Sequence, residues 1–252
     1  MDAVTQVPAP YNEPIGTFAP GTPERALLER SLTDTVTAVR ELPNVIGGRK
    51  VMASGERIEV RSPHERARLL GTTANSTHDD ARAAIAAAKA AAPMWRDLPF
   101  DERAAVILRA ADLLAGPWRG KVLAATVWGQ SKTSFQAEID AACELIDFWR
   151  FNVHFARQII AEQPVSSPGV WNRTDHRPLE GFVYAITPFN FTAIAGNLPT
   201  APALMGNTVV WKPSPTQQLA ASITMLAFSF SRHSSEKRGS SMLASPQRRA
   251  GR

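Results

Sequence analysis

A strand–helix–strand pattern over residues 181–214 constrains the fold of this chain more than any other feature. Two continuous apolar runs, at 182–186 and 208–211, are typical of parallel strands that are buried on both faces. The roughly twenty residues between the two runs are enough for a right-handed crossover helix. We therefore predict an α/β fold with two neighbouring parallel strands. The second strand would form an apolar edge, which predicts poor solubility when the chain is expressed alone.

Polar residues follow both strands at the point where each strand ends. Asn190 comes after the first strand, and Lys212 closes the second. Ligands bind at this carboxyl edge of open α/β sheets, so we expect both side chains to lie at a binding site. The residues alone leave two interpretations of each side chain open. Asn190 can stabilise an oxyanion or cap the next helix, and Lys212 can bind a nucleotide or remain solvated.

A strong helix start follows the second strand. Ser214 is a preferred N-cap residue, Pro215 suits the first helical position, and Gln217 completes a capping box. The helix is predicted to run to about Phe228, and its free N–H groups can bind an anion. The Gly-x-Gly-x-x-Gly fingerprint of many dinucleotide sites does not occur in the sequence.

The residues before this region are predicted to be mainly helical. Residues 1–24 contain five prolines and no periodicity, which indicates an extended arm or a disordered end. Gly47-Gly48 predicts a tight turn between two short strands within 44–51, and 57–61 predicts a further strand. The longest periodic run, 134–160, predicts one helix about 40 Å long. Other helices are predicted at 25–40, at 81–92 after a cap at Thr77 and before Pro93, at 101–114 and at 118–128.

The basic charge of the chain is confined to its last residues. The whole chain carries a net charge of +5, and residues 229–252 carry the same excess, so residues 1–228 are neutral overall. No basic face of the kind that nucleic acid binding requires is expected on the folded part. The Ser- and Arg-rich segment 229–252 is predicted to be a disordered tail. A nucleic acid-binding tail is the alternative, and salt-dependent DNA retention that is lost on deleting 229–252 would support it.

The sequence gives no sign of export, membrane insertion or metal binding. No apolar run is long enough to span a bilayer, and the N-terminus lacks the pattern of a signal peptide. The single cysteine, Cys143, suits a reducing compartment, and its place in the apolar stripe of the long helix favours a packed thiol over a nucleophile. The five histidines show no metal-ligand spacing. We expect a cytoplasmic protein with no metal, membrane or nucleic acid partner.

Three separated motifs resemble the aldehyde dehydrogenase superfamily. They are Ile-Thr-Pro-Phe-Asn-Phe at 186–191, Gly-Asn-Thr-Val-Val-Trp-Lys-Pro-Ser at 206–214, and Gln-Ala-Glu-Ile-Asp-Ala-Ala-Cys-Glu-Leu-Ile-Asp-Phe-Trp-Arg-Phe-Asn at 136–152. The third motif and the Phe-Asn-Phe-Thr variant are most similar to one branch, the 1-pyrroline-5-carboxylate (L-glutamate γ-semialdehyde) dehydrogenases. The resemblance covers about residues 1–222 and matches the N-terminal portion of an enzyme about twice as long.

This resemblance implies an incomplete Rossmann-type parallel sheet with helices and a protruding hairpin. It also implies NAD-dependent oxidation of the semialdehyde to glutamate in proline degradation, carried out by a homo-oligomer. Asn190 matches the oxyanion-stabilising asparagine of the family. The positions that match or border the NAD site are Ile186, Thr187, Pro188, Phe189, Lys212 and Ser214, and those that match the aldehyde pocket are Glu144 and Phe191.

The sequence departs from the family pattern after residue 222. The family's nucleophilic cysteine, general-base glutamate and pyrophosphate-binding loop have no counterpart in it. We therefore expect a chain that is truncated, as by a shifted reading frame or a premature stop, and inactive alone, since the covalent step would be missing. The alternative is a non-catalytic interaction partner that pairs with a full-length enzyme through 163–179.

The predicted organisation has five segments. They are an N-terminal arm and helix (1–40), the helical and strand part of an NAD-binding domain (41–162), an oligomerisation hairpin (163–180), the first β-α-β-α unit of the sheet (181–228) and the basic tail (229–252).

Overall fold

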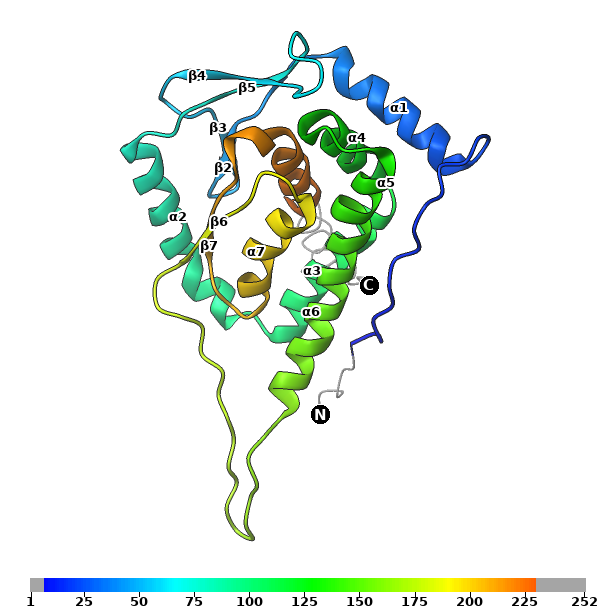
Figure 1. Cartoon of the computed structure of the whole chain (residues 1–252). Coiled ribbons are helices and arrows are strands. Elements are labelled where there is room, and N and C mark those ends of the chain that lie inside the picture. Colours follow the sequence, from blue (N-terminus) through cyan, green and yellow to red (C-terminus); the bar gives the residue numbers. More distant parts are fainter. Residues whose placement is uncertain (1–6, 230–252) are drawn as a thin grey trace, which may run out of the picture.

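A layer of helices forms the centre of the molecule (Figure 1). The computed structural model describes residues 7–229, so all but the first residue of the predicted tail at 229–252 lies outside them. Trp149 is the largest fully buried side chain, and its indole N–H donates to Thr200 Oγ1 at 2.9 Å. Four helices contribute most of the core around it: α3 (Phe100–Ala115), α4 (Arg119–Gln130), α6 (Glu144–Ala161) and α7 (Thr192–Leu204).

The predicted long helix is present but contains a widened turn. The short helix α5 (Ser134–Ala137) leads into a π-helical segment, η1 (Glu138–Cys143), after which α6 continues to Ala161. Backbone hydrogen bonds in a π-helix run between residues i and i+5, one residue further than in an α-helix. The prediction of a single period of 3.6 residues across 134–160 is therefore wrong within η1.

Short strands cover one end of the helical layer. β2 (Asn44–Ile46) and β3 (Arg49–Val51) form the predicted antiparallel pair. Gly47 and Gly48 between them have φ angles of 56° and 78°, a region in which glycine is favoured. The predicted strand β4 (Arg57–Arg61) pairs with β5, which also pairs with β1. The sequence pattern did not reveal these two partners, β5 (Leu69–Ala74) and β1 (Arg40–Glu41).

Two further helices flank the strands, α1 (Pro23–Thr37) and α2 (His78–Asp97). Thr77 caps α2 as predicted, and its hydroxyl and the carboxylate of Asp80 form a capping box. The prediction that Pro93 ends this helix is wrong, because α2 continues past the proline. Its last turn is held by Trp95, whose indole N–H donates to the carbonyl of Ala203 at 2.8 Å.

The parallel strands β6 (Val183–Ile186) and β7 (Val209–Lys212) are the predicted pair, and α7 connects them. Among the described residues they form a sheet of two strands. Ala185 is buried, whereas Tyr184 and Ile186 on the opposite face of β6 are 56% and 59% exposed. The prediction that β6 is buried on both faces is therefore wrong for residues 7–229.

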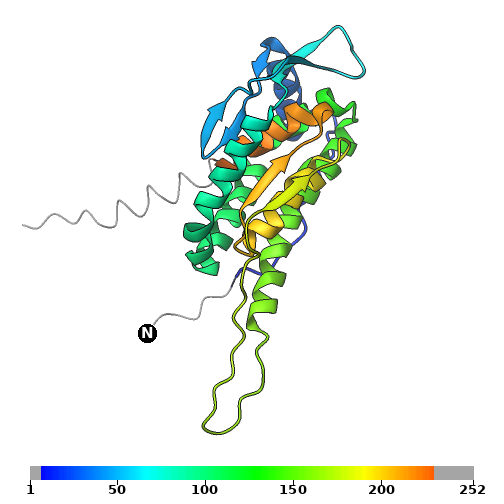
Figure 2. The same ribbon diagram turned by 90° about the vertical axis from the view of Figure 1, so that its left-hand side faces the viewer.

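Residues 162–182, here called the excursion, extend beyond the end of α6 as a long loop (Figures 1 and 2). It protrudes as predicted but forms no strand, so the predicted hairpin lacks a β-ladder. Side-chain hydrogen bonds join its two arms, such as the one from Thr174 N–H to Gln163 Oε1 at 2.8 Å. Val165 and Trp171 are 89% and 79% exposed.

Candidate functional site

The turns that follow β6 and β7 lie side by side at one edge of the sheet. Ile186 is paired in register with Lys212, and the N–H of Thr187 donates to the Lys212 carbonyl at 3.3 Å. Thr187 is buried, and its hydroxyl accepts a hydrogen bond from the indole N–H of Trp211 at 2.9 Å. The first turn (187–191) and the second turn (213–217) are thus brought together.

Asn190 lies exposed in the first turn. The next helix, α7, begins at Thr192 with Phe191 as its N-cap residue, and no side chain of the described residues caps it. The interpretation of Asn190 as a helix cap is therefore wrong. Within residues 7–229 its carboxamide has no hydrogen-bond partner, so its N–H₂ group is available to a ligand. Phe189 beside it is 62% exposed, and Pro188 is half-buried.

The second turn differs from the predicted capped helix. Ser214 precedes a 3₁₀ turn, η2 (Pro215–Gln217), and its hydroxyl lies 3.2 Å from Thr216 Oγ1. The α-helix follows at 218–229. Gln217 does not complete a capping box with Ser214, because its side chain is 1% exposed and points inward. The physical reason is a buried partner, since Gln217 Nε2 donates to Thr192 Oγ1 at 3.5 Å.

Thr192 is the centre of a buried polar cluster beneath both turns. Its hydroxyl accepts a hydrogen bond from Gln130 Nε2 at 2.7 Å and lies 2.9 Å from Thr126 Oγ1. The end of α4, the first turn of α7 and η2 therefore meet at one hydroxyl group, which fixes the two strand-end turns relative to each other. Sequence reasoning missed this cluster because its members have no shared spacing. The polar pair Thr126 and Gln130, four residues apart in an apolar helix, was the available signal.

The predicted pocket residues Glu144 and Phe191 both lie near a lysine, Lys132, that sequence reasoning also missed. Lys132 Nζ is 4.0 Å from the centre of the Phe191 ring, within range of a cation–π interaction. The same ammonium group forms an ion pair with Asp140 in η1. Asp140 and Lys132 are in turn close enough to Glu144 to influence its charge. A lysine placed just before a helix that carries acidic residues was the signal for this contact.

Glu144 has an unusual electrostatic environment. Burial, and then the negative charge of Asp140, raises the pKa of its carboxyl group, and Lys132 opposes this effect. Its Oε2 atom is buried, and no group in the described part of the chain donates to it. A buried acceptor without a donor is costly, and perturbed groups of this kind gather at functional sites, where a ligand can supply the donor.

Cys143 lies in the same long helix but is not suited to act as a nucleophile. It is buried, with 6% of its surface exposed. Burial and the negative charge of Glu138 raise the pKa of its thiol to about 12. The thiolate is the reactive form of cysteine, so this thiol stays protonated near neutral pH. The prediction of a packed thiol is confirmed.

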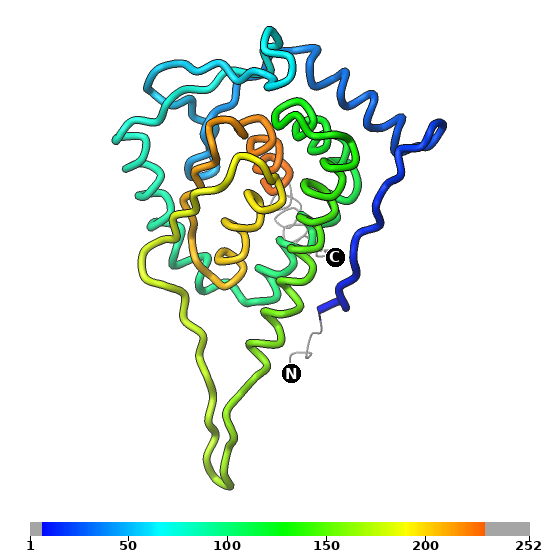
Figure 3. The backbone as a smooth tube through the Cα atoms, in the orientation of Figure 1, coloured from blue at the N-terminus to red at the C-terminus, as the bar shows by residue number. Residues whose placement is uncertain are grey.

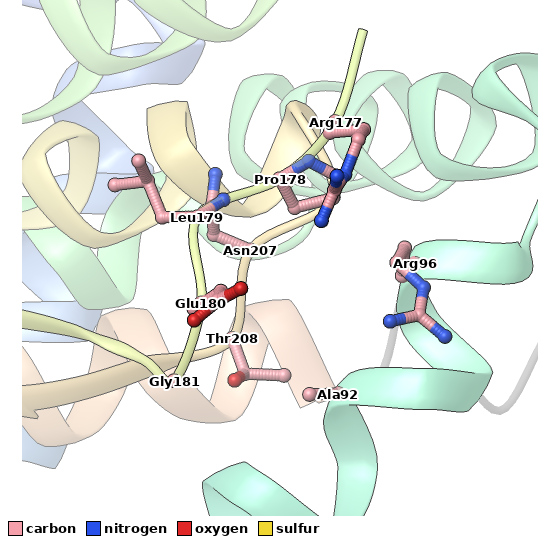
Figure 4. A pocket seen from close by; sticks show the side chains of 10 residues that line it. Ala92, Arg96, Arg177, Pro178, Leu179, Glu180, Gly181, Asn207 and Thr208 are labelled. Carbon is pink, nitrogen blue, oxygen red and sulfur yellow. The ribbon is translucent and has the colours of Figure 1, made fainter. Parts of the chain in front are cut away.

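A cavity of about 240 Å³ lies at the other end of the strands, before β6 and β7 begin (Figure 4). Arg96 from α2 lines it together with Arg177 and Glu180 from the excursion. We place the candidate site at the strand-end turns and not in this cavity, because ligands of open α/β sheets bind at the carboxyl ends of the strands.

Residues 7–229 hold no membrane-spanning helix and no cluster of metal ligands. None of the helices in that range is both long and apolar enough to cross a bilayer. No group of three or more His, Cys, Asp or Glu side chains there is placed to hold a metal ion.

Comparison with known proteins identifies the family. Residues 50–232 match the model of the aldehyde dehydrogenase family, which is most of the chain. The chain therefore belongs to this family, and the family resemblance of its motifs is confirmed.

Several similar proteins bear the name of the predicted branch. The Delta-pyrroline-5-carboxylate dehydrogenase of Mycobacterium tuberculosis, also solved with NAD bound, has a TM-score of 0.90 and 65% identity over 92% of this chain and 43% of its own. The 1-pyrroline-5-carboxylate dehydrogenase from Thermus with bound NAD has a TM-score of 0.82 and 30% identity over 90% of this chain and 44% of its own. The mitochondrial Delta-1-pyrroline-5-carboxylate dehydrogenase of Mus musculus is 50% identical over 83% of this chain and 37% of its own. The chain thus spans less than half the length of these relatives.

Proposed function

We propose that the two strand-end turns form part of an NAD-dependent aldehyde dehydrogenase site that oxidises L-glutamate γ-semialdehyde to glutamate. The observation that carries the proposal is the pairing of Ile186 with Lys212, which places the Asn190 turn beside the Lys212 turn. The 65% identity to a pyrroline-5-carboxylate dehydrogenase that binds NAD supports the choice of substrate and cofactor.

The residues present fit a dinucleotide that has a planar aromatic ring at one end and a ribose at the other. Lys212 is exposed, and no ion pair engages it within the described residues, so it can bind the adenosine ribose. Ile186 and Phe189 are 59% and 62% exposed and give an apolar surface for the nicotinamide end, with Thr187 and Pro188 forming the floor. Ser214 borders the same edge. NAD supplies the acceptor for the hydride that leaves the aldehyde carbon.

The substrate side would be formed by Asn190, Phe191 and Glu144. The exposed N–H₂ group of Asn190 would donate to the oxygen of the aldehyde as negative charge develops on it, which is worth about 3–4 kcal/mol in comparable sites. The half-buried Phe191 ring would contact the carbon chain. The unpartnered Oε2 of Glu144 would accept a hydrogen bond from a donor of the substrate.

Residues 1–252 are proposed to lack turnover by themselves. Cys143 is the only cysteine among them, and its thiol has a pKa of about 12. Covalent aldehyde oxidation needs an ionised thiol, so no group in this sequence supplies the nucleophile.

The experiment measures NAD binding and NADH formation separately. Equilibrium dialysis of the purified chain with NAD should show binding that Lys212→Ala weakens, with exposed Lys89→Ala as the matched control. NADH formation from the semialdehyde should appear only when the unmatched segment of the Mycobacterium tuberculosis relative is added. Turnover by the chain alone that survives Cys143→Ala would contradict the proposed lack of a nucleophile. Absence of NAD binding both to the chain alone and to the chain with the added segment would contradict the proposed site.

A second candidate function is a non-catalytic partner that associates through the excursion. The exposed apolar side chains of Val165, Trp171 and Leu179 favour it, since such groups are common in interfaces. Homo-oligomerisation through the same segment is the related proposal. Co-purification with a full-length dehydrogenase that Trp171→Arg abolishes would support this function, and a monodisperse monomer that captures no dehydrogenase would contradict it.

The cellular compartment is a separate prediction. The cytoplasm is expected from the sequence, whereas several similar proteins carry the word mitochondrial in their names. Imaging of a tagged chain in its native cell tests this.

A further inference from the structure

The N-terminal arm, residues 7–22, runs beside the long helix (Figure 3). The side chain of Asn12 and the backbone N–H of Glu13 both donate to the carboxylate of Asp147 at 2.7 Å. The N–H of Gly16 donates to Glu138 Oε1, also at 2.7 Å. Carboxylates of the long helix therefore hold a segment that is remote from it in sequence.

Buried ion pairs join the arm to the helices. Arg119 pairs with Glu13 and with Glu138, each at 2.5 Å, and Arg150 pairs with Glu13 at 2.7 Å. These four side chains are at most 13% exposed, and that of Glu138 is fully buried. Removing one partner of a buried pair leaves an uncompensated charge, which is strongly unfavourable. The arm thus supplies Glu13, the carboxylate that compensates the buried charges of Arg119 and Arg150.

The arm contacts both ends of η1. Glu138 is its first residue and Cys143 its last, and the Cys143 thiol lies 3.8 Å from Glu138 Oε1 and 3.7 Å from the carbonyl of Pro14. In an α-helix, residues five apart point about 140° away from each other. The i to i+5 bonds of the π-helix bring such residues onto one face. The π-helical turn is therefore what allows Glu138 and Cys143 to face the arm together.

The candidate site depends on the same turn. Asp140 lies within η1 and pairs with Lys132, which lies over Phe191. If η1 became an α-helix, its turn would contain one residue fewer. The residues that precede η1 would then be rotated by about 100° relative to α6. Asp140 would then lose its place opposite Lys132.

We propose that the N-terminal arm, through Glu138, fixes the π-helical turn and so positions Lys132 against Phe191 at the substrate side of the candidate site. Glu138 is a positioning residue, since it acts through Asp140 and Lys132. The inference rests on the proposed function only in calling this the substrate side.

Cys143 reports on the arm, because it is the only cysteine in the chain. Its rate of modification by a disulfide reagent such as DTNB is measured on the full chain. Glu13→Gln should raise this rate by about tenfold or more, because it breaks a buried pair and favours release of the arm. Glu29→Gln is the matched control. Glu29 pairs with Arg25 on the exposed surface of α1, so this variant should react at the parent rate.

Lys132 reports on the site. Reductive methylation with ¹³C-formaldehyde gives each lysine an NMR signal, and the ring of Phe191 shifts that of Lys132. The variant Lys132→Arg assigns the signal. In Glu13→Gln and Glu138→Gln we expect it to move toward the position of an exposed lysine, while circular dichroism and the remaining lysine signals stay unchanged.

Two results would overturn the proposal. One is faster modification of Cys143 with an unmoved Lys132 signal, which would mean that the arm can be released without affecting the site. The other is modification at the parent rate in Glu13→Gln. If Glu138→Gln fails to fold, Asp147→Ala removes the acceptor of Asn12 and Glu13 from α6, outside η1, and gives the same test. Neither readout involves NAD or turnover. Failure of this proposal can therefore be distinguished from failure of the proposed function.

Discussion

The N-terminal arm (residues 7–22) and the excursion (residues 162–182) both lack helix and strand, yet they are held in different ways. The arm sends backbone and side-chain donors to Asp147 and Glu138 and places Glu13 between two arginines. The excursion bonds mainly to itself, as between Asn172 N–H and Ser166 Oγ, and leaves its apolar side chains exposed.

The difference shows that secondary structure alone does not decide which irregular segments belong to the folded body. Backbone polar groups need partners when they are buried. The arm finds them on the long helix, and its burial is therefore coupled to the packing of α4 and α6. The excursion finds most of its partners within itself, and only near its end does Leu179 N–H donate to Asn207 Oδ1 of the body, so its conformation places little demand on the rest of the chain. Three of the following four changes test this contrast and one tests the candidate site, and they are given in order of decreasing expected effect.

Arg119→Ala is expected to have the largest effect. It leaves Glu13 and Glu138 buried without their shared cation, so the free energy of unfolding should fall by about 3–5 kcal/mol. Urea denaturation followed by circular dichroism measures the loss. Arg25→Ala, which removes an exposed ion pair on α1, is the control and should cost less than about 1 kcal/mol. If both variants lost the same free energy of unfolding, the ion pairs of the arm would be no more stabilising than an exposed surface ion pair.

Asp147→Ala should have an intermediate effect. It removes the acceptor of two hydrogen bonds from the arm but breaks no buried ion pair. A loss of about 1–2 kcal/mol is expected from hydrogen bonds of this kind. Hydrogen exchange of residues 12–16 should increase at the same time. Unchanged exchange there would mean that the ion pairs of Glu13 and the Gly16 hydrogen bond hold the arm without Asp147.

Glu144→Gln is expected to stabilise the fold, and only at higher pH. The pKa of Glu144 is raised in the folded state by burial and by Asp140, so the ionised carboxylate disfavours folding. This penalty is absent below the ordinary pKa of 4.5 and develops as pH rises through the raised value. The melting temperature of the variant should therefore exceed that of the parent at about pH 8 and equal it at about pH 4. A gain that is the same at both pH values would contradict the assignment.

Trp171→Ser in the excursion should have the smallest effect. The side chain is 79% exposed, so the free energy of unfolding should change by less than about 0.5 kcal/mol. Trp149→Ser, at the centre of the core, is the contrasting variant and should be strongly destabilising. A substantial loss for Trp171→Ser in a monomer would show that the excursion packs against the body.

Much of the fold could be predicted because local signals agreed with tertiary packing. The Gly47-Gly48 turn and the Thr77 cap depend on backbone geometry and adjacent donors, and both formed as expected. Prediction failed where a distant residue changed the outcome. Pro93 does not end α2, and Trp95 two residues further on in the same helix bonds to the distant Ala203.

The candidate site was predicted in its strand-end part and missed in its supporting part. Asn190 and Lys212 stand at the ends of recognisable strands, so their adjacency follows from parallel pairing. Lys132 and Thr192 act through contacts with residues from other helices, which no spacing in the sequence encodes. The same reasoning explains Gln217, whose local signal for a capping box gave way to a buried partner.

The separation of Glu13 and Arg150 along the sequence affects how the chain folds during its synthesis. The two residues are 137 positions apart, so Glu13 emerges from the ribosome long before its partner exists. Closing so long a loop is entropically unfavourable until the intervening helices have formed. We expect the arm to join the body late in folding, after α4 and α6 have packed, and to be the first part to detach when the protein begins to unfold.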